Sequence, residues 1–120
     1  MRLQALRGAI TCTEDSKAEI DAKTARLVKE LFARNELAHD DVVSIIFTTT
    51  PDLTAEFPAY AARLLGLTDV PLMCASEIAV PGAMPRVLRL LAHVETDLGR
   101  ADVRHVYLRG AAALRSDLPR

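Results

Sequence analysis

Three arginines stand among apolar residues in this sequence, and their side chains are the strongest candidates for chemistry. Arg7 lies in LRGAI, Arg63 in AARLL and Arg89 in VLRLL. A guanidinium in such a setting either extends its apolar stem to reach water or lines a pocket that binds an anion. Only convergence of the three in space would favour the pocket, so the sequence leaves both interpretations open.

Two further side chains could act beside them. Glu77 comes directly after a predicted strand, where loops often present functional groups, although an exposed loop carboxylate is the alternative. Tyr107 lies between Val106 and Leu108, on the polar side of a predicted strand. It could serve a site or simply cover the sheet, and neither interpretation is favoured.

Other common catalytic patterns are missing. His39, His93 and His105 have no nucleophile or carboxylate at a telling spacing, so we leave them out of the site. Cys12 and Cys74 form neither a CxxC motif nor a zinc spacing, and we expect no disulfide and no metal site. The chain also lacks GxSxG, P-loop and GxGxxG motifs, which gives no support to a hydrolase, an NTPase or a dinucleotide-binding enzyme.

The elements that must position these side chains follow from periodicity and from turn residues. Strands are predicted over 3–12 (interrupted at Gly8), Val42–Thr49, 70–76 and 105–109. Helices are predicted from the capping pair Ser16 and Glu19 to Asn35, over 58–65 with Gly66 after it, and over 85–94. The third of these helices would carry Arg86 and Arg89 one turn apart.

This order, β-α-β-α-β-α-β, predicts a single domain of the α+β class over residues 1–120, with one sheet and its helices packed on it. Three helices on one side would leave the other face or the edges of a small sheet in need of cover. A closed, symmetric oligomer is a physical way to supply it. Only a five-residue tail follows Arg115.

The charge balance limits the partners. Fifteen Lys and Arg nearly cancel 16 Asp and Glu, so no global positive field would gather nucleic acid or an anionic membrane. The first 15 residues lack the apolar run of a secretion signal, and no stretch approaches the ~18 apolar residues of a membrane span. We therefore expect a cytoplasmic protein that holds any anion with a local cluster of cations.

Several segments together resemble one family, the small trimeric chorismate mutases of mixed α/β fold, which are distinct from the all-helical ones. The matching segments are LRGAIT at 6–11, TTPDLTAEFPA at 49–59, LMCASE at 72–77 and RHVYL at 104–108, with the later LR at 114–115. They cover essentially the whole chain in order. Tyr60 departs from the pattern, because a lysine is common there.

The resemblance implies a homotrimer with a pseudo-barrel core and a site at each subunit interface, where chorismate rearranges to prephenate in aromatic amino acid biosynthesis (the shikimate pathway). No metal, cofactor or covalent intermediate would be involved. Arg89 would act on the ether oxygen, Arg7 and Tyr107 on carboxylates, and Glu77 on the ring hydroxyl. The substrate-binding residues carried over from the resemblance are Cys74, Phe57, Ala59, Arg63, Leu72, Met73, Leu114 and Arg115.

Two other functions remain open from the sequence. A deaminase of reactive enamines or imines could use a similar trimeric fold, and a non-catalytic trimer could bind a carboxylate of the aromatic pathway. Loss of the diene absorbance of chorismate would distinguish the mutase from both. The sequence does not assign which subunit donates which residue.

Overall fold

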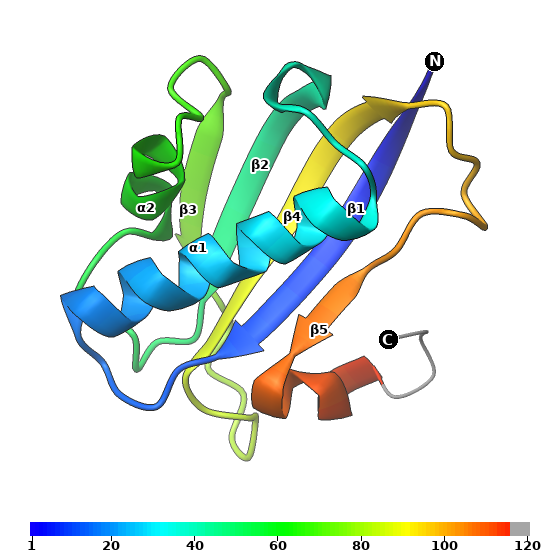
Figure 1. The fold of residues 1–120 in the computed structure, drawn as a ribbon. Helices are drawn as coiled ribbons and strands as arrows, with labels where there is room; N and C mark the ends of the chain where they lie inside the picture. The colour runs from blue at the N-terminus through cyan, green and yellow to red at the C-terminus, as the bar shows by residue number, and fades with distance from the viewer. Residues whose placement is uncertain (116–120) are drawn as a thin grey trace.

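One mixed sheet forms the centre of the computed structural model, which describes residues 1–115 (Figure 1). The tail after Arg115 lies outside the described residues. The strands are β1 (Arg2–Thr11), β2 (Val42–Thr49), β3 (Leu72–Ser76), β4 (Val87–Thr96) and β5 (Val106–Leu108). Their order across the sheet is β3-β2-β4-β1-β5.

The strand pairings place the two longest strands side by side in the sheet. β4 runs antiparallel to β1 on one side and to β2 on the other. β3 then adds parallel to β2, and β5 adds parallel to β1. Since β1 and β4 both have neighbours on each side, side chains from distant parts of the chain meet on them.

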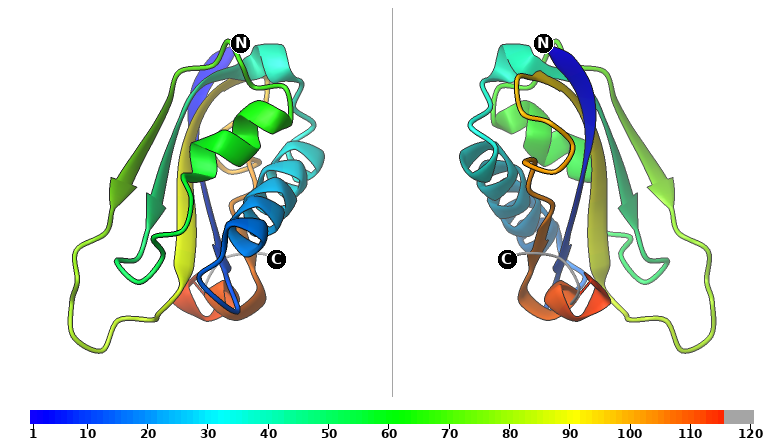
Figure 2. Two further views of the ribbon diagram at one scale, coloured as in Figure 1. Left: turned by 90° about the vertical axis from the view of Figure 1, so that its left-hand side faces the viewer. Right: turned by 90° about the vertical axis from the view of Figure 1, so that its right-hand side faces the viewer.

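Two helices, α1 (Lys17–Arg34) and α2 (Pro58–Leu64), cover one face of the sheet (Figure 2). The Ser16 hydroxyl accepts a hydrogen bond from the N–H of Glu19 at 3.2 Å, as the capping pair predicts. The Glu19 carboxylate, however, accepts from the backbone of the preceding loop instead of from Ser16. Pro58 opens α2, and Gly66 follows its end with φ +100°, as expected. Within residues 1–115, neither helix is both long and apolar enough to cross a membrane.

The main core lies between these helices and the sheet. Alternate residues of the strands point into it, among them Leu6 and Ile10 of β1 and Leu88 and Leu90 of β4, all at most 3% exposed. The residues between them face the opposite side, which neither α1 nor α2 covers. The 3₁₀ helix Arg109–Arg115 packs on one end of this side, against Ala9 and Val87. We call this side, which has no α-helix on it among the described residues, the bare face. A sheet with one bare face is therefore the feature that positions the site.

The third predicted helix is wrong, because residues 87–96 form strand β4. Val87, Leu88, Leu91 and Val94 fit a helical repeat, but Leu88, Leu90, Ala92 and Val94 also alternate, and this second set enters the core. A central strand is apolar on both faces, so its sequence is ambiguous between the two periods. Arg89 consequently belongs to a strand, and Arg86 precedes that strand with φ +52°.

Smaller differences concern the strand boundaries. β1 runs through Gly8 without interruption. A Cβ atom at Gly8 would lie 3.2 Å from the Leu27 side chain and 3.3 Å from the Val106 carbonyl, so glycine allows α1 and β5 to approach closely. β3 starts at Leu72, two residues later than predicted, and β5 ends at Leu108, where Arg109 begins a 3₁₀ helix, η2 (Arg109–Arg115). The prediction of a single sheet with helices packed on it is confirmed.

Candidate active site

The bare face of the sheet brings cations from three elements into one hollow. A cavity of about 490 Å³, which we call the arginine cavity, is lined by Arg7 of β1, Arg89 of β4 and Arg115 of η2, together with Tyr107 of β5. Its apolar walls include Ile46 and Leu91. The sequence placed Arg7 and Arg89 in apolar surroundings without a common location, and tertiary structure supplies it.

Strand register explains this convergence. Ala9 of β1 pairs with Arg89 on one side and with Tyr107 on the other, so the three residues form a row across neighbouring strands. Arg7 lies two residues along β1 and therefore projects from the same face. Ala9 itself is fully buried in a small cluster with Val87 and Ala111, against which Tyr107 packs.

Glu77 lies beside Arg89, in a neighbouring hollow that Arg89 also borders. Its carboxylate accepts a hydrogen bond from the Thr48 hydroxyl at 2.7 Å, and its N–H donates to the Thr49 carbonyl at 2.8 Å. The carboxylate oxygen Oε2 lies 3.1 Å from Nε of Arg89. Thr48 pairs with Arg89 across the strands, so β2 holds Glu77 beside the guanidinium.

The Glu77–Arg89 contact is an ion pair whose geometry leaves a donor unused. Nε of Arg89 is buried and makes no hydrogen bond within residues 1–115, since its N–H does not point along the short distance to Glu77. Arg89 also borders a second hollow of about 250 Å³ beside Asp52 and Met84. A preorganised cation with hydrogen-bonding capacity to spare can stabilise an anionic ligand atom.

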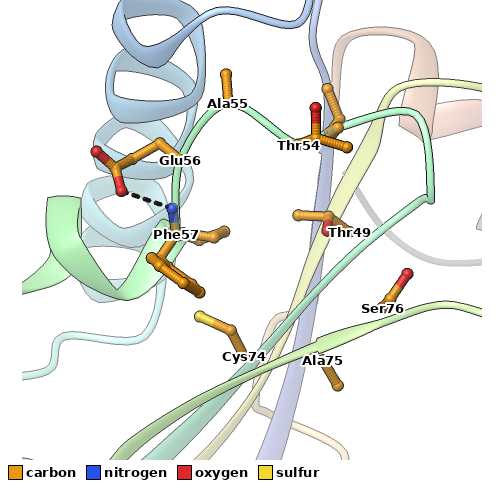
Figure 3. A pocket seen from close by; sticks show the side chains of 10 residues that line it. Thr49, Thr54, Ala55, Glu56, Phe57, Cys74, Ala75 and Ser76 are labelled. Atoms are coloured by element: carbon orange, nitrogen blue, oxygen red, sulfur yellow. Dashed lines mark hydrogen bonds between the residues drawn. The ribbon is translucent and has the colours of Figure 1, made fainter.

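A second group of expected site residues lies elsewhere in the same chain. Phe57 and Cys74 line a cavity of about 320 Å³ between the loop before α2 and strand β3, where the Phe57 ring is directed toward the Cys74 thiol (Figure 3). Cys74 pairs with Phe47, a core residue, and so projects toward the helices. This cavity and the arginine cavity therefore open on opposite faces of the sheet.

The remaining expected residues are spread over several environments. Arg63 is exposed on α2, and Met73 is 63% exposed on the bare face. Ala59 is buried in the core and Leu72 packs against it. Leu114 packs beside Tyr107 on a small cluster that includes Ala9. One protomer thus unites Arg7, Glu77, Arg89, Tyr107 and Arg115, but not the second group.

Thr48 and His105 are not among the residues that the sequence predicts for the site, and each contacts a residue of it. Thr48 binds Glu77, and alternation along Val42–Thr49 could have placed it on the face opposite Phe47. His105, set aside because it lacks a catalytic partner, contacts the backbone of Arg7. Tyr60, which departs from the family pattern, lies on α2 with Nζ of Lys17 4.1 Å from the centre of its ring.

Comparisons with known proteins agree with the resemblance. The family model described as chorismate mutase type I matches residues 3–118. Chorismate mutase AroH of Thermus thermophilus is 45% identical over 117 residues, which are 97% of this chain and 96% of that protein. Chorismate mutase AroH of Bacillus subtilis (strain 168) is 39% identical over 119 residues, 98% and 94% of the two chains.

A solved structure supports the same conclusion for the fold. The chorismate mutase from Clostridium thermocellum superimposes with a TM-score of 0.90 at 48% sequence identity, covering 92% of this chain and 98% of that one. Together with the family match over nearly the full length, this confirms the fold class and the expected isomerase function over the deaminase and binding-module alternatives. The chain belongs to the chorismate mutase type I family.

Proposed function

We propose that this chorismate mutase rearranges chorismate to prephenate in the cavity on the bare face of the sheet, with the Arg89 guanidinium against the ether oxygen. The observation that carries this assignment is the convergence of Arg7, Arg89 and Tyr107, with Glu77 fixed beside Arg89. Chorismate is a small dianion. The arginines offer it local positive charge that the nearly neutral chain as a whole lacks.

The reaction is intramolecular and balanced without a proton donor or acceptor. The ether C–O bond breaks and a C–C bond forms within one molecule, so no atom is gained or lost. Where the C–O bond breaks first, negative charge grows on the ether oxygen. A fixed cation there stabilises the transition state more than the ground state, which raises the rate.

The other side chains have binding and orienting roles in this proposal. Arg7 and Tyr107 bind substrate carboxylates, and Glu77 accepts a hydrogen bond from the ring hydroxyl. Holding the flexible enolpyruvyl arm over the ring lowers the entropic part of the barrier. The Arg89 side chain is 41% exposed and lines the cavity, so its guanidinium can reach the substrate oxygen.

We also propose that the site is completed by a second copy of the chain in a homotrimer. Two observations support this. Phe57 and Cys74 line a hollow on the opposite face of the sheet from the arginine cavity. If these two residues contact the substrate bound in the arginine cavity, they must therefore come from a neighbouring copy of the chain. The bare face also exposes apolar side chains, including Met73 at 63%, that an oligomer would cover. The free thiols Cys12 and Cys74 suit a cytoplasmic, reducing location.

Mixing two inactive variants tests both proposals. The purified wild-type chain should consume chorismate, seen as loss of diene absorbance, and Arg89→Ala and Phe57→Ala should each be impaired. When the two variants are unfolded and refolded together, roughly a quarter of the interface sites would combine two intact halves and regain activity.

Each proposal has its own contradicting result. A folded wild-type chain that leaves chorismate unchanged would overturn the catalytic assignment. Refolded mixtures without any gain over the separate variants, or a monomer in light scattering, would overturn the shared site while leaving the catalytic role of Arg89 standing.

A further inference from the structure

His105 holds the backbone of Arg7 through an unusual rung of the sheet. The backbone N–H of Arg7 donates to Nδ1 of His105 at 2.9 Å. The regular pairing of β1 with β5 begins one residue later, where Gly8 is opposite Val106. The imidazole therefore extends the β1–β5 contact by one residue, with a ring nitrogen in the place of a backbone carbonyl.

The position of this contact gives it significance. On the β4 side of β1, Arg7 is opposite Leu91. The His105 contact holds Arg7 on the β5 side, one residue before the regular pairing of β1 with β5 begins. The Arg7 side chain lines the cavity that also contains Arg89 and Tyr107. A shift of β1 at this residue would carry the guanidinium away from the others.

We infer that His105 is a positioning residue for Arg7, whose unprotonated Nδ1 holds the Arg7 backbone so that the guanidinium meets a substrate carboxylate. The inference rests on the proposed function for the role of Arg7 and deepens it. His105 itself does not touch the substrate in this account.

The contact requires one protonation state. An imidazole nitrogen that accepts a hydrogen bond carries no proton, so the neutral ring bears its hydrogen on Nε2. The imidazolium would direct an N–H at the N–H of Arg7, and the contact would be lost. Protonation of His105 is thus a switch that releases the Arg7 backbone.

The surroundings of His105 favour the neutral ring. Burial lowers the pKa of His105, and the nearby cations Arg7 of β1 and Arg115 of η2 lower it further. Tyr107 of β5, two residues further along, is a titratable residue on the same side of the chain as His105. α1 packs against the other face, where Val106 and Leu108 point. The contact should therefore be intact at neutral pH and lost in acid.

Three substitutions of His105 test the role of its hydrogen-bond acceptor separately from that of the rest of the imidazole ring. The amide oxygen of His105→Asn can occupy the place of Nδ1 but does not titrate. His105→Gln places its amide near the position of Nε2, and His105→Leu removes the acceptor. At about pH 8 we expect the Leu and Gln variants to raise KM for chorismate on the order of ten-fold with little change in kcat, because Arg7 binds ground and transition states alike. The Asn variant should stay within about two-fold of wild type.

The pH dependence of KM distinguishes this positioning role from a merely structural role of His105, which would not change with pH in this way. As pH falls below the ordinary histidine range of about 6.5, the wild-type KM should rise while the KM of His105→Asn stays level. Identical profiles for the two proteins, or a wild-type KM in His105→Leu or His105→Gln, would overturn the inference.

A measurement without substrate separates this inference from the proposed function. In ¹H–¹⁵N spectra, the Arg7 amide of wild type and His105→Asn should be protected from hydrogen exchange at about pH 8, and that of His105→Leu should not. Equal protection in all three proteins would contradict the contact even if chorismate turns over. If the Arg7 amide is protected as expected in the three proteins but the wild-type protein does not convert chorismate, only the catalytic assignment is contradicted.

Discussion

Replacing Arg89 by alanine should abolish most of the activity while leaving the fold nearly unchanged. The side chains of Arg89 and Glu77 are 41% and 18% exposed, so water screens their ion pair. Partly exposed pairs of this kind contribute about 0 to 1 kcal/mol to the free energy of unfolding. Arg89→Ala should therefore cost about 1 kcal/mol or less, a few degrees in Tm.

The expected effect on catalysis is much larger. One preorganised donor at a developing oxyanion is worth about 2.7 to 4 kcal/mol, or 10² to 10³ in kcat. Arg89 supplies a full charge from a side chain that lines the cavity, so the loss in Arg89→Ala should reach at least about 10³. Arg89→Lys keeps the charge but lacks the planar donor, and should lose roughly 10- to 100-fold.

The assay is the initial rate of chorismate consumption together with thermal unfolding of each variant. Arg100→Ala is the matched control, because Arg100 is exposed in the loop after β4 and lines none of the cavities described above. It should match wild type in both measurements. An Arg89→Ala protein that keeps its Tm and loses less than about ten-fold in kcat would refute the reasoning.

Three further predictions concern stability and reactivity. The buried Asn35 side chain donates a hydrogen bond to the Arg104 carbonyl and accepts one from the Arg104 N–H. Asn35→Ala should therefore lower the free energy of unfolding by about 2 to 4 kcal/mol, measured by urea titration. An unchanged urea midpoint would contradict this. Burial and the nearby Glu19 raise the pKa of Cys12 to about 11, so a thiol reagent should modify Cys74 and spare Cys12 in the native protein near neutral pH; equal labelling of both would show that Cys12 is accessible. Hydrogen bonds from the preceding loop lower the pKa of Glu19 to about 2, so the folded state favours its ionised form. Its contribution to stability should be complete above the unfolded pKa of about 4.3 and disappear as pH falls through about 2; a stability difference between wild type and Glu19→Gln that stays constant with pH would disprove it.

Local signals in the sequence determined many elements of this protein. Ser16 and Glu19 marked the start of α1, Pro58 and Gly66 bounded α2, and the β-branched run Val42–Thr49 became β2. These predictions succeeded because a cap, a fixed φ angle and a short β-branched run act through neighbouring atoms. The resemblance of LRGAIT, TPDL and RHVYL to one family was likewise readable from the chain alone, and the comparisons confirm it.

Only the tertiary structure decided where β4 lies and what it brings together. The segment around Arg89 fits a helix as well as a strand, and pairing with β1 on one side and β2 on the other made it a strand. That same pairing puts Arg89, Ala9 and Tyr107 in one row and leaves Phe57 on the far face. Local sequence cannot specify such contacts, because their free energy comes from hydrogen bonds and burial between segments that are distant in the chain.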